Sequence, residues 1–531
     1  ITLFFEHGKV HFKVAKGAQP EQQFIDQLKQ HKEAIAAFLS KGSEHFKTIN
    51  PTLEKIQPYS KPAHIPLSYA QERLWFLDKL KGSTNYHIPL VWRVSGELNL
   101  DALEQAFQQI INHHAILRTV YYEAEGKPFQ KVLARDTWRM QRTYQEELIG
   151  VDVAAFINEE VYRAFDLKTD HTLRVHTIID SDEAYTVIVV FHHIAFDGWS
   201  VPLFLDNLQA YYRAEVEGRP AALPDCPIQY TDYALWQREP ATLSGFEEKL
   251  QYWEDTLRDI TPSALPTDYP RTQAPTTHGK AYVHALDAGL KERLAELCKA
   301  QGVTMFTALL SAFKVLLYKY TGSADICVGS PVANRTQTEI EPLIGFFVNT
   351  VVFRSKLAPE LSYQALLAQV RETVIATQQY QDVPFEKIVE RVVKERDATR
   401  NPLFDVMFTL DRANGSEGFS LGKATFSNAD FINEIAKFDL VCTLTEKPDG
   451  LDLSMVYSLA LFSEGTIKQL VAHFESLLKA LLAEPLVEIG QLTMLSEAEQ
   501  EKLLHTFNAT RAFYEREASL VDLFERQVAA R

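Results

Sequence analysis

Apolar positions recur along the chain with periods that change from segment to segment. In "ITLFFEHGKVHFKV" two β-rich runs flank His7-Gly8, which predicts a hairpin, and "EQQFIDQLKQHKEAIAAFLSKG" carries apolar residues at helical spacing. The stretch "NPTLEKIQPYSKPAHIP" mixes prolines with polar residues and is typical of a tether. We therefore expect a small N-terminal unit, followed by a linker.

From Leu67 to about Leu492 predicted strands and helices alternate without a clear boundary. "AYTVIVVFHHIAFDG" reads as a buried strand and "SVPLFLDNLQAYYRAEVEG" as the helix after it. Later, "TMFTALLSAFKVLLYKYTG" reads as a helix that precedes the strand "ADICVGSPVANR". The pattern predicts an α/β fold with a mixed sheet, in which two halves each surround a core of their own. The tail "SEAEQEKLLHTFNATRAFYEREASLVDLFERQVAAR" is charged and helical in places.

Composition narrows the class of protein. The 531 residues, 46% hydrophobic and 23% charged, are those of a globular protein of several domains. The net charge of -16 argues against a nucleic-acid binder. Residues 1–60 nevertheless carry eight lysines and six acidic residues, a balance of +2. The four cysteines form no CxxC pair, so we expect no metal site, and no apolar run is long enough for a bilayer span. These features favour a cytoplasmic protein.

Candidate chemistry gathers where the buried strand ends, at "HHIAFDG". It contains His192, His193, Asp197 and Gly198, directly before a predicted helix. A second pair, His113-His114, serves as a control, because it is followed by an apolar stretch and not by Asp-Gly. The neighbours therefore favour the later pair as the functional one.

These residues carry a resemblance. "HHIAFDG" resembles the HHxxxDG signature of the condensation domains of nonribosomal peptide synthetases, and further segments resemble the other signature motifs in the family's order. They are "LSYAQERLWFL" (67–77), "HHAILRT" (113–119), "YTDYALWQ" (230–237), "IGFFVNT" (344–350), "QDVPFEKIV" (381–389) and "RDATRNPLFDVMF" (396–408). The resemblance covers about Ile65 to Leu492. We interpret Trp75, Phe76 and Leu77 of the first segment, together with the aromatic residues of "YTDYALWQ", as core residues.

The family fold implies two lobes like chloramphenicol acetyltransferase in a V-shaped pseudodimer, with the histidines at the lobe interface. The implied organisation is a docking domain (1–58), a linker (59–66), an N-terminal lobe (67–240), a C-terminal lobe (241–492), and a second linker with the start of a truncated adenylation domain (493–531). The small α+β N-terminal unit resembles TubC-type docking domains, which bind the C-terminal tail of a preceding subunit. Lys9, His11, Lys13 and Lys16 would face such an acidic tail.

The resemblance implies peptide-bond formation, in which the α-amine of an acceptor aminoacyl thioester attacks a donor acyl thioester. Both substrates would be carried on the 4'-phosphopantetheine arms of carrier proteins, so the chain itself needs no bound cofactor. Histidine titrates in the range of an α-amine, whose pKa is about 8. His193 is therefore the candidate either to take the amine proton or to orient the amine, and the resemblance leaves both roles open.

Other residues receive supporting roles. Gly198 precedes a helix, where its N–H and the helix N-terminus would face a developing oxyanion. The resemblance implies an ion pair between Asp197 and Arg335, and it places Trp199, Ser200 and Asn349 along the substrate tunnel. His192 belongs to the same signature, although histidines at such positions often have a packing role.

Three alternatives differ in function. An epimerisation domain shares the fold and the signature, but the sequences of "SYAQERLWFL" and "DGWS" resemble the corresponding motifs of condensation domains more closely. A heterocyclisation domain would replace the histidine pair with an aspartate motif. A catalytically inactive scaffold that recruits carrier proteins would not need His193, Asp197 and Gly198 together. The segments "IGFFVNT" and "DGWS" resemble the subtype whose donor ends in a D-residue.

Overall fold

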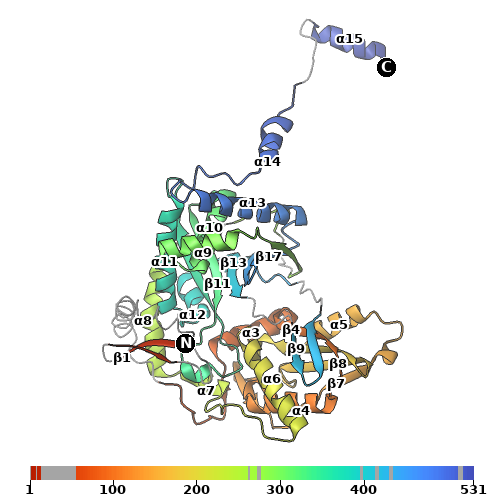
Figure 1. The fold of residues 1–531 in the computed structure, drawn as a ribbon. Helices are drawn as coiled ribbons and strands as arrows, with labels where there is room; N and C mark the ends of the chain where they lie inside the picture. The colour runs from red at the N-terminus through yellow and green to blue at the C-terminus, as the bar shows by residue number, and fades with distance from the viewer. Residues whose placement is uncertain are drawn as a thin grey trace. The chain divides into compact units, whose positions relative to one another are not determined.

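The computed structural model describes residues 2–6, 9–13, 55–260, 264–271, 277–394, 397, 399–412, 418–429, 435–511 and 518–530. The chain forms two compact units (Figure 1). Unit 1 comprises Ile1–Tyr252, Ala333–Val348 and Ser420–Phe426, and unit 2 comprises Trp253–Val332, Asn349–Phe419 and Ser427–Arg531. The change-over at Tyr252 lies within helix α8 (Pro240–Leu257), whereas the sequence predicts a boundary at residue 240. The segments Ala333–Val348 and Ser420–Phe426 also belong to unit 1, so a single boundary in the sequence does not separate the two units.

Unit 1 contains a six-stranded sheet in the order β14-β15-β4-β9-β8-β7. Its strands are β4 (His87–Ser95), β7 (Gln141–Tyr144), β8 (Leu173–Ser181), β9 (Ala184–His192), β14 (Gly418–Leu421) and β15 (Ala424–Asn428). A three-stranded sheet, β3-β6-β5, consists of β3 (Ile65–Pro66), β5 (Thr119–Ala124) and β6 (Lys127–Val132). β9 is a central strand, buried at every residue after Ala184, which explains its nearly continuous apolar run.

The described residues of unit 1 include helices α3 (Tyr69–Lys81), α4 (Leu100–His113), α5 (Val153–Tyr162), α6 (Ser200–Glu217) and α7 (Tyr230–Trp236). α4 and α6 lie side by side in Figure 1, and Phe107 of α4 meets Phe204 of α6 with ring centroids 6.0 Å apart. Both phenylalanines are fully buried. This aromatic layer forms part of the unit's core.

Unit 2 contains a second six-stranded sheet, in the order β10-β17-β16-β13-β11-β12. Its strands are β10 (Gly279–Ala285), β11 (Asp325–Val332), β12 (Asn349–Lys356), β13 (Val406–Arg412), β16 (Leu440–Lys447) and β17 (Gly450–Ser458). The β11–β13 and β13–β16 pairs are parallel and the others antiparallel, which confirms the predicted mixed sheet.

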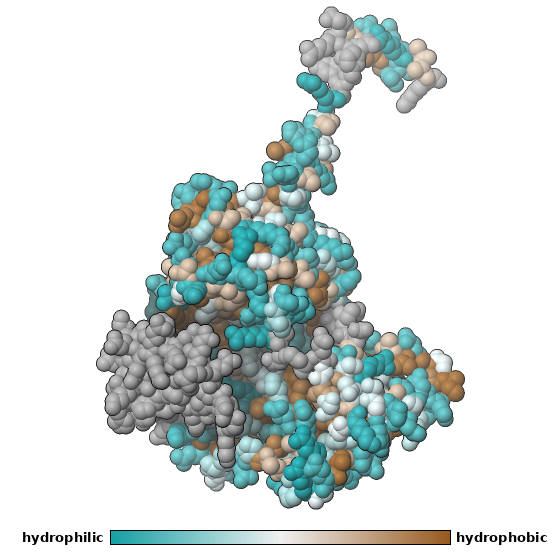
Figure 2. Space-filling view, in the orientation of Figure 1, coloured by the Kyte–Doolittle hydropathy of each residue, from teal (hydrophilic) through white to brown (hydrophobic). Residues whose placement is uncertain are grey.

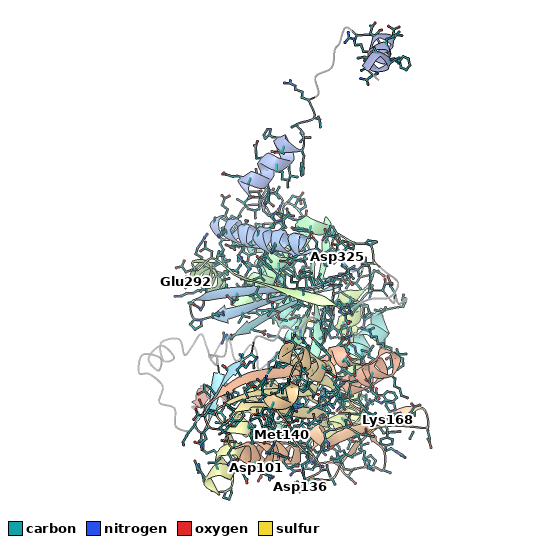
Figure 3. The ribbon with its side chains drawn as sticks, turned by 90° about the vertical axis from the view of Figure 1, so that its right-hand side faces the viewer. Asp101, Asp136, Met140, Lys168, Glu292 and Asp325 are labelled. Atoms are coloured by element: carbon teal, nitrogen blue, oxygen red, sulfur yellow. The ribbon has the colours of Figure 1, made fainter. Side chains whose placement is uncertain are left out.

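The described residues of unit 2 include helices α9 (Leu290–Gln301), α10 (Met305–Thr321), α11 (Tyr363–Gln379), α12 (Phe385–Val392) and α13 (Glu464–Ala483). Figure 3 shows α13 along one face of the sheet and labels Asp325 at the start of β11, where Arg354 Nε binds its carboxylate at 2.9 and 3.1 Å. Gly329 of β11 lies against the ring of Phe404 so closely that a Cβ would collide with it. This close approach explains a glycine in the middle of a strand.

The predicted strand before a helix (β9, α6) and helix before a strand (α10, β11) are confirmed, as is the N-terminal hairpin of β1 (Thr2–Glu6) and β2 (Lys9–Lys13). The helix predicted after that hairpin lies outside the described residues. The predicted tether is packed against unit 1: Ile56 is buried, Tyr59 N donates to Asp232 Oδ1 at 2.7 Å, and Lys61 pairs with the same carboxylate.

The tail holds helices α14 (Glu497–Glu501) and α15 (Leu520–Ala530), with a π-helical turn at Lys502–Thr506. Hydrophilic residues are widespread among the coloured residues of Figure 2, and apolar side chains such as Ile149 and Leu486 are exposed. Within the part of the chain that the structure describes, no single helix is long and apolar enough to cross a membrane; α9 and α10 pass that test only as a pair bent by 105°.

Candidate active site

The signature histidines lie where β9 leaves the sheet of unit 1. His192 is the last residue of the strand, and His193 begins a 3-10 turn, His193–Ala195, before α6 starts at Ser200. The rings of Phe191 and Phe196 stack across this turn with centroids 3.7 Å apart. Both are fully buried, so the turn is anchored in the core on either side of His193.

His193 is partly buried, and its orientation follows from one hydrogen bond. Its Nδ1 lies 2.7 Å from the carbonyl oxygen of Phe196. A carbonyl can only accept, so Nδ1 carries a proton, and in the neutral form of the ring Nε2 holds the lone pair. The ring of Phe346 packs against the imidazole with centroids 4.7 Å apart. His193 therefore has the tautomer that a proton acceptor at Nε2 requires.

His192 has a different environment. It is fully buried, and its Nδ1 accepts a hydrogen bond from Ile194 N at 3.1 Å. Its Nε2 is 2.7 Å from Ser83 Oγ, and that hydroxyl donates to Asp78 Oδ1. Both ring nitrogens are thus engaged within the fold. This geometry favours the packing role for His192 over the catalytic one.

Asp197 is fully buried and holds two chain segments together. Its Oδ1 accepts from Ser200 N at 2.9 Å and from Ser200 Oγ at 2.8 Å, and its Oδ2 accepts from the backbone N–H groups of Phe347 and Val348 at 2.9 and 3.2 Å. Arg335 Nη2 lies 3.4 Å from Oδ1, so the ion pair that the resemblance implied is present. The carboxylate ties the start of α6 to the segment 344–348.

Arg335 extends the same network. Its Nη1 donates to the carbonyls of Ile340 and Leu343, both at 2.7 Å, and its guanidinium lies over the ring of Phe347 at 4.4 Å. Its Nη2 also donates to Ser200 Oγ at 3.0 Å. Ser200 is fully buried with its hydroxyl occupied, which favours a structural place for it over the predicted tunnel lining.

Gly198 and Trp199 are exposed at the N-terminal end of α6, unlike their neighbours Asp197 and Ser200. Trp199 has an exposed fraction of 44%. A Cβ added to Gly198 would meet nothing within 4 Å, and its φ lies outside the left-handed region. Neither packing nor backbone conformation therefore requires glycine at position 198.

Asn349 lies in unit 2, at the start of β12, and its amide is fully used there. Nδ2 donates to the carbonyls of Gln381 and Val383 at 2.7 Å each, and Oδ1 accepts from Phe385 N at 3.1 Å. The side chain is thus occupied in holding the start of α12 against β12. This geometry favours a structural role over the predicted tunnel lining.

The control pair is structural. His114 is buried, with Nε2 2.8 Å from Asn207 Nδ2 and Nδ1 accepting from Ile344 N at 3.4 Å. Burial, together with the nearby His113 and Arg335, lowers the pKa of His114 to about 3, so it stays neutral at physiological pH. His113 Nε2 contacts Cys226 Sγ at 3.0 Å. The choice of the later pair agrees with this geometry.

Of the aromatic residues interpreted as core, Trp75, Tyr230, Tyr233 and Trp236 are buried, but Phe76 is 58% exposed. Two residues near the site were not predicted from the sequence: Phe346, whose ring packs on His193, and the buried Gln71 of α3. A polar residue inside the apolar motif "LSYAQERLWFL" was the available signal for Gln71. Of the docking residues, Lys9, His11 and Lys13 lie on β2, and Lys16 is outside the described residues.

Comparison with known proteins adds the family context. The family model described as "Condensation domain" matches residues 61–504. One component of the linear gramicidin synthase of Brevibacillus parabrevis is 39% identical over 483 residues, which cover 89% of this chain and 9% of that protein. The chain thus spans about a tenth of the length of this curated relative.

Two solved structures share the fold. The X-domain from teicoplanin biosynthesis superposes with a TM-score of 0.76 and 26% identity, covering 83% of this chain and all of that chain. A four-domain nonribosomal peptide synthetase bound to AMP and glycine gives a TM-score of 0.77 and 20% identity, covering 90% of this chain and 37% of that chain. The two-sheet architecture is therefore shared with both proteins.

Proposed function

Because this chain belongs to the condensation domain family, we propose that it forms a peptide bond between a donor acyl thioester and the α-amine of an acceptor aminoacyl thioester. The observation that carries the proposal is the contact of His193 Nδ1 with the carbonyl of Phe196, which makes Nε2 the nitrogen that can accept a proton when the ring is neutral. Both substrates are carried on 4'-phosphopantetheine arms of carrier proteins.

The reaction requires little activation. The neutral amine nitrogen attacks the thioester carbon, a C–N bond forms, and the C–S bond breaks to release the thiol of the donor arm. One amine proton must leave, and it ends on the departing sulfur. An amine N–H that points at His193 Nε2 serves either role of this histidine, as the base that transfers the proton or as the acceptor that orients the amine.

The tetrahedral adduct carries a negative oxygen, which needs a donor. We assign this role to the backbone N–H of Gly198, supported by its exposure and by its place ahead of the 18-residue helix α6. Asp197 and Arg335 do not contact substrate in this mechanism. They fix the loop that joins His193 to Gly198 through the hydrogen bonds of the Asp197 carboxylate.

Further partners are part of the proposal. The N-terminal residues, with the β1–β2 hairpin, recruit the tail of an upstream synthetase subunit; among the described strands β2 pairs only with β1. α15 belongs to the start of a downstream adenylation domain in the same chain, and the enzyme acts in the cytoplasm. The donor ends in a D-residue, as the likeness of "IGFFVNT" and "DGWS" to that subtype suggests.

The alternative is a scaffold that recruits other proteins without catalysis. One observation supports this alternative. A protein of similar structure, the X-domain from teicoplanin biosynthesis, has been solved in a complex with OxyB. The scaffold does not require an oriented His193. A catalytic test therefore separates the two functions.

The test offers the protein two donor carrier proteins, loaded with the same peptide ending in a D- or an L-residue, and an acceptor carrier loaded with an amino acid. Mass spectrometry of the acceptor follows elongation. We expect a longer chain on the acceptor, formed faster from the D-donor. Absence of elongation with either donor would support the scaffold, and exchange of the Cα hydrogen on a loaded carrier would indicate an epimerase.

A further inference from the structure

A buried capping box lies beneath the turn that carries His193. Ser68 caps α3: its Oγ accepts from Gln71 N at 3.2 Å, and its own N–H donates to Gln71 Oε1 at 3.2 Å. Both side chains are fully buried. Capping boxes usually satisfy only their own helix end. In this capping box Gln71 Oε1 accepts the hydrogen bond from Ser68 N, and both N–H donors of Gln71 Nε2 remain available for other acceptors.

Those two donors reach the His193 turn. Gln71 Nε2 donates to the carbonyl of Ile194 at 3.1 Å and to the hydroxyl of Tyr121 at 3.0 Å. The Tyr121 hydroxyl in turn lies 3.5 Å from the same carbonyl. Because Oε1 faces an N–H and Nε2 faces a carbonyl, only one orientation of the amide satisfies every group. The middle residue of the turn is thus held from below by α3.

The serine of the same box holds the other side of the imidazole. Ser68 Oγ lies 2.9 Å from the hydroxyl of Tyr230, and that hydroxyl donates to the carbonyl of Phe346 at 2.6 Å. Phe346 is the residue whose ring packs against His193. A single capping box therefore fixes both the backbone next to His193 and the backbone of its aromatic neighbour.

We propose that the Ser68–Gln71 capping box is the positioning unit of His193, which sets the direction of its Nε2. This inference rests on the proposed function, in which Nε2 meets the amine. The hydrogen bond from His193 Nδ1 to Phe196 spans the turn that Gln71 holds, so a tilt of the turn breaks it. A fully satisfied buried network specifies one geometry, whereas apolar packing would allow several. Gln71 is a positioning residue and touches no substrate.

Two substitutions separate positioning from capping. Gln71→Glu keeps the acceptor that closes the box but removes both Nε2 donors, and Gln71→Met removes the whole amide without adding a charge. We expect each folded variant to lower kcat about 10- to 100-fold, with KM for the carrier proteins within about twofold. Gln130→Met is the matched control, because Gln130 is also buried and its Nε2 donates to a backbone carbonyl, that of Pro66, at 2.8 Å.

A readout besides activity reports on the imidazole itself. Selective 15N-histidine labelling, with His193→Ala for assignment, gives the tautomer of His193. We expect the Nδ1–H form in the wild type and in Gln130→Met, and loss of that preference in the Gln71 variants. Wild-type kcat and tautomer in a folded Gln71 variant would overturn the proposal, as would equal losses in Gln130→Met.

Tyr230→Phe keeps the proposal testable if both Gln71 variants fail to fold, since it deletes one hydroxyl only. It releases the Phe346 carbonyl, and we expect a lowered kcat and an altered signal of the His193 ring; unchanged values would contradict the proposal. If His193→Ala retains full activity, the proposed role of His193 fails. The tautomer measurements still decide whether the capping box positions the ring.

Discussion

The carboxylate of Asp197 accepts a hydrogen bond from the backbone N–H of Phe347, 2.9 Å away, across 150 residues of sequence. Removing this fully buried carboxylate leaves the N–H groups of residues 347 and 348 without their acceptor, and it leaves the guanidinium of Arg335 without its counter-charge. We expect Asp197→Ala to lower the free energy of unfolding by about 3–5 kcal/mol, measured by urea denaturation. The control is the exposed pair of Glu97 and Lys423, where Glu97→Gln leaves the midpoint unchanged. An Asp197→Ala midpoint equal to that of the wild type would contradict this role.

His192 and His193 are neighbours with opposite expected behaviour. His192→Ala leaves the buried N–H of Ile194 without its acceptor and removes one hydrogen bond of Ser83, whose hydroxyl still donates to Asp78. We expect it to lower the free energy of unfolding by about 1–3 kcal/mol. Its folded fraction retains elongation activity, because the ring does not meet the substrate in the proposed mechanism. Thermal unfolding and single-turnover assays on the same sample check both statements. Full stability together with lost elongation would return His192 to the catalytic residues.

Gly198→Ala tests whether the backbone N–H of Gly198, ahead of α6, binds the oxyanion. A Cβ there meets nothing within 4 Å, so the free energy of unfolding should change by no more than about 0.5 kcal/mol. In the proposed reaction the methyl group stands where the thioester carbonyl approaches, and kcat should fall about 100-fold. Quenched-flow elongation assays measure the rate. Unchanged kcat would remove Gly198 from the oxyanion site.

Lys314 of α10 gives a prediction for pH dependence. It is fully buried, its Nζ lies 2.7 Å from Ser355 Oγ, and burial lowers its pKa to about 7, although the nearby Cys327 and Asp325 act in the opposite direction. In the unfolded chain a lysine has a pKa of about 10.4. Above pH 7 the unfolded state therefore binds the proton that the folded state has lost, and this lysine makes stability rise with pH.

The variant Lys314→Met should remove that rise and increase the free energy of unfolding at pH 7 by about 1–4 kcal/mol. Guanidinium titrations of both proteins at pH 7 and pH 8.5 compare the two slopes. The four cysteines are the same in both proteins, so their ionisation cancels in the difference between the slopes. A wild-type slope equal to that of Lys314→Met would show that the lysine remains charged in the fold.

The sequence was informative where local periodicity decides the structure. The apolar run of β9 and the helical spacing of α6 and α10 predicted those elements, because burial of one strand or one helix face leaves a pattern within twenty residues. The motif order identified the family. The ion pair between Asp197 and Arg335 came from that resemblance and not from any local pattern.

The roles of single polar residues were harder to predict, because their partners are distant in sequence. Asn349 meets carbonyls more than thirty residues away, and the Gln71 amide binds Ile194, 123 residues later. From the sequence alone, an asparagine or glutamine that lines a substrate tunnel cannot be distinguished from one whose amide is buried and fully hydrogen-bonded. The division into units was also hidden, since the segment Ala333–Val348 returns to unit 1 after unit 2 has begun.

The single-turnover elongation of an acceptor carrier by folded His193→Ala tests the central claim most directly. We predict that this variant unfolds at the wild-type temperature, still binds both loaded carriers, and forms the longer acceptor-bound peptide at least about 100 times more slowly than the wild type. Elongation by His193→Ala at the wild-type rate would contradict the assignment of His193, and with it the mechanism built on its Nε2.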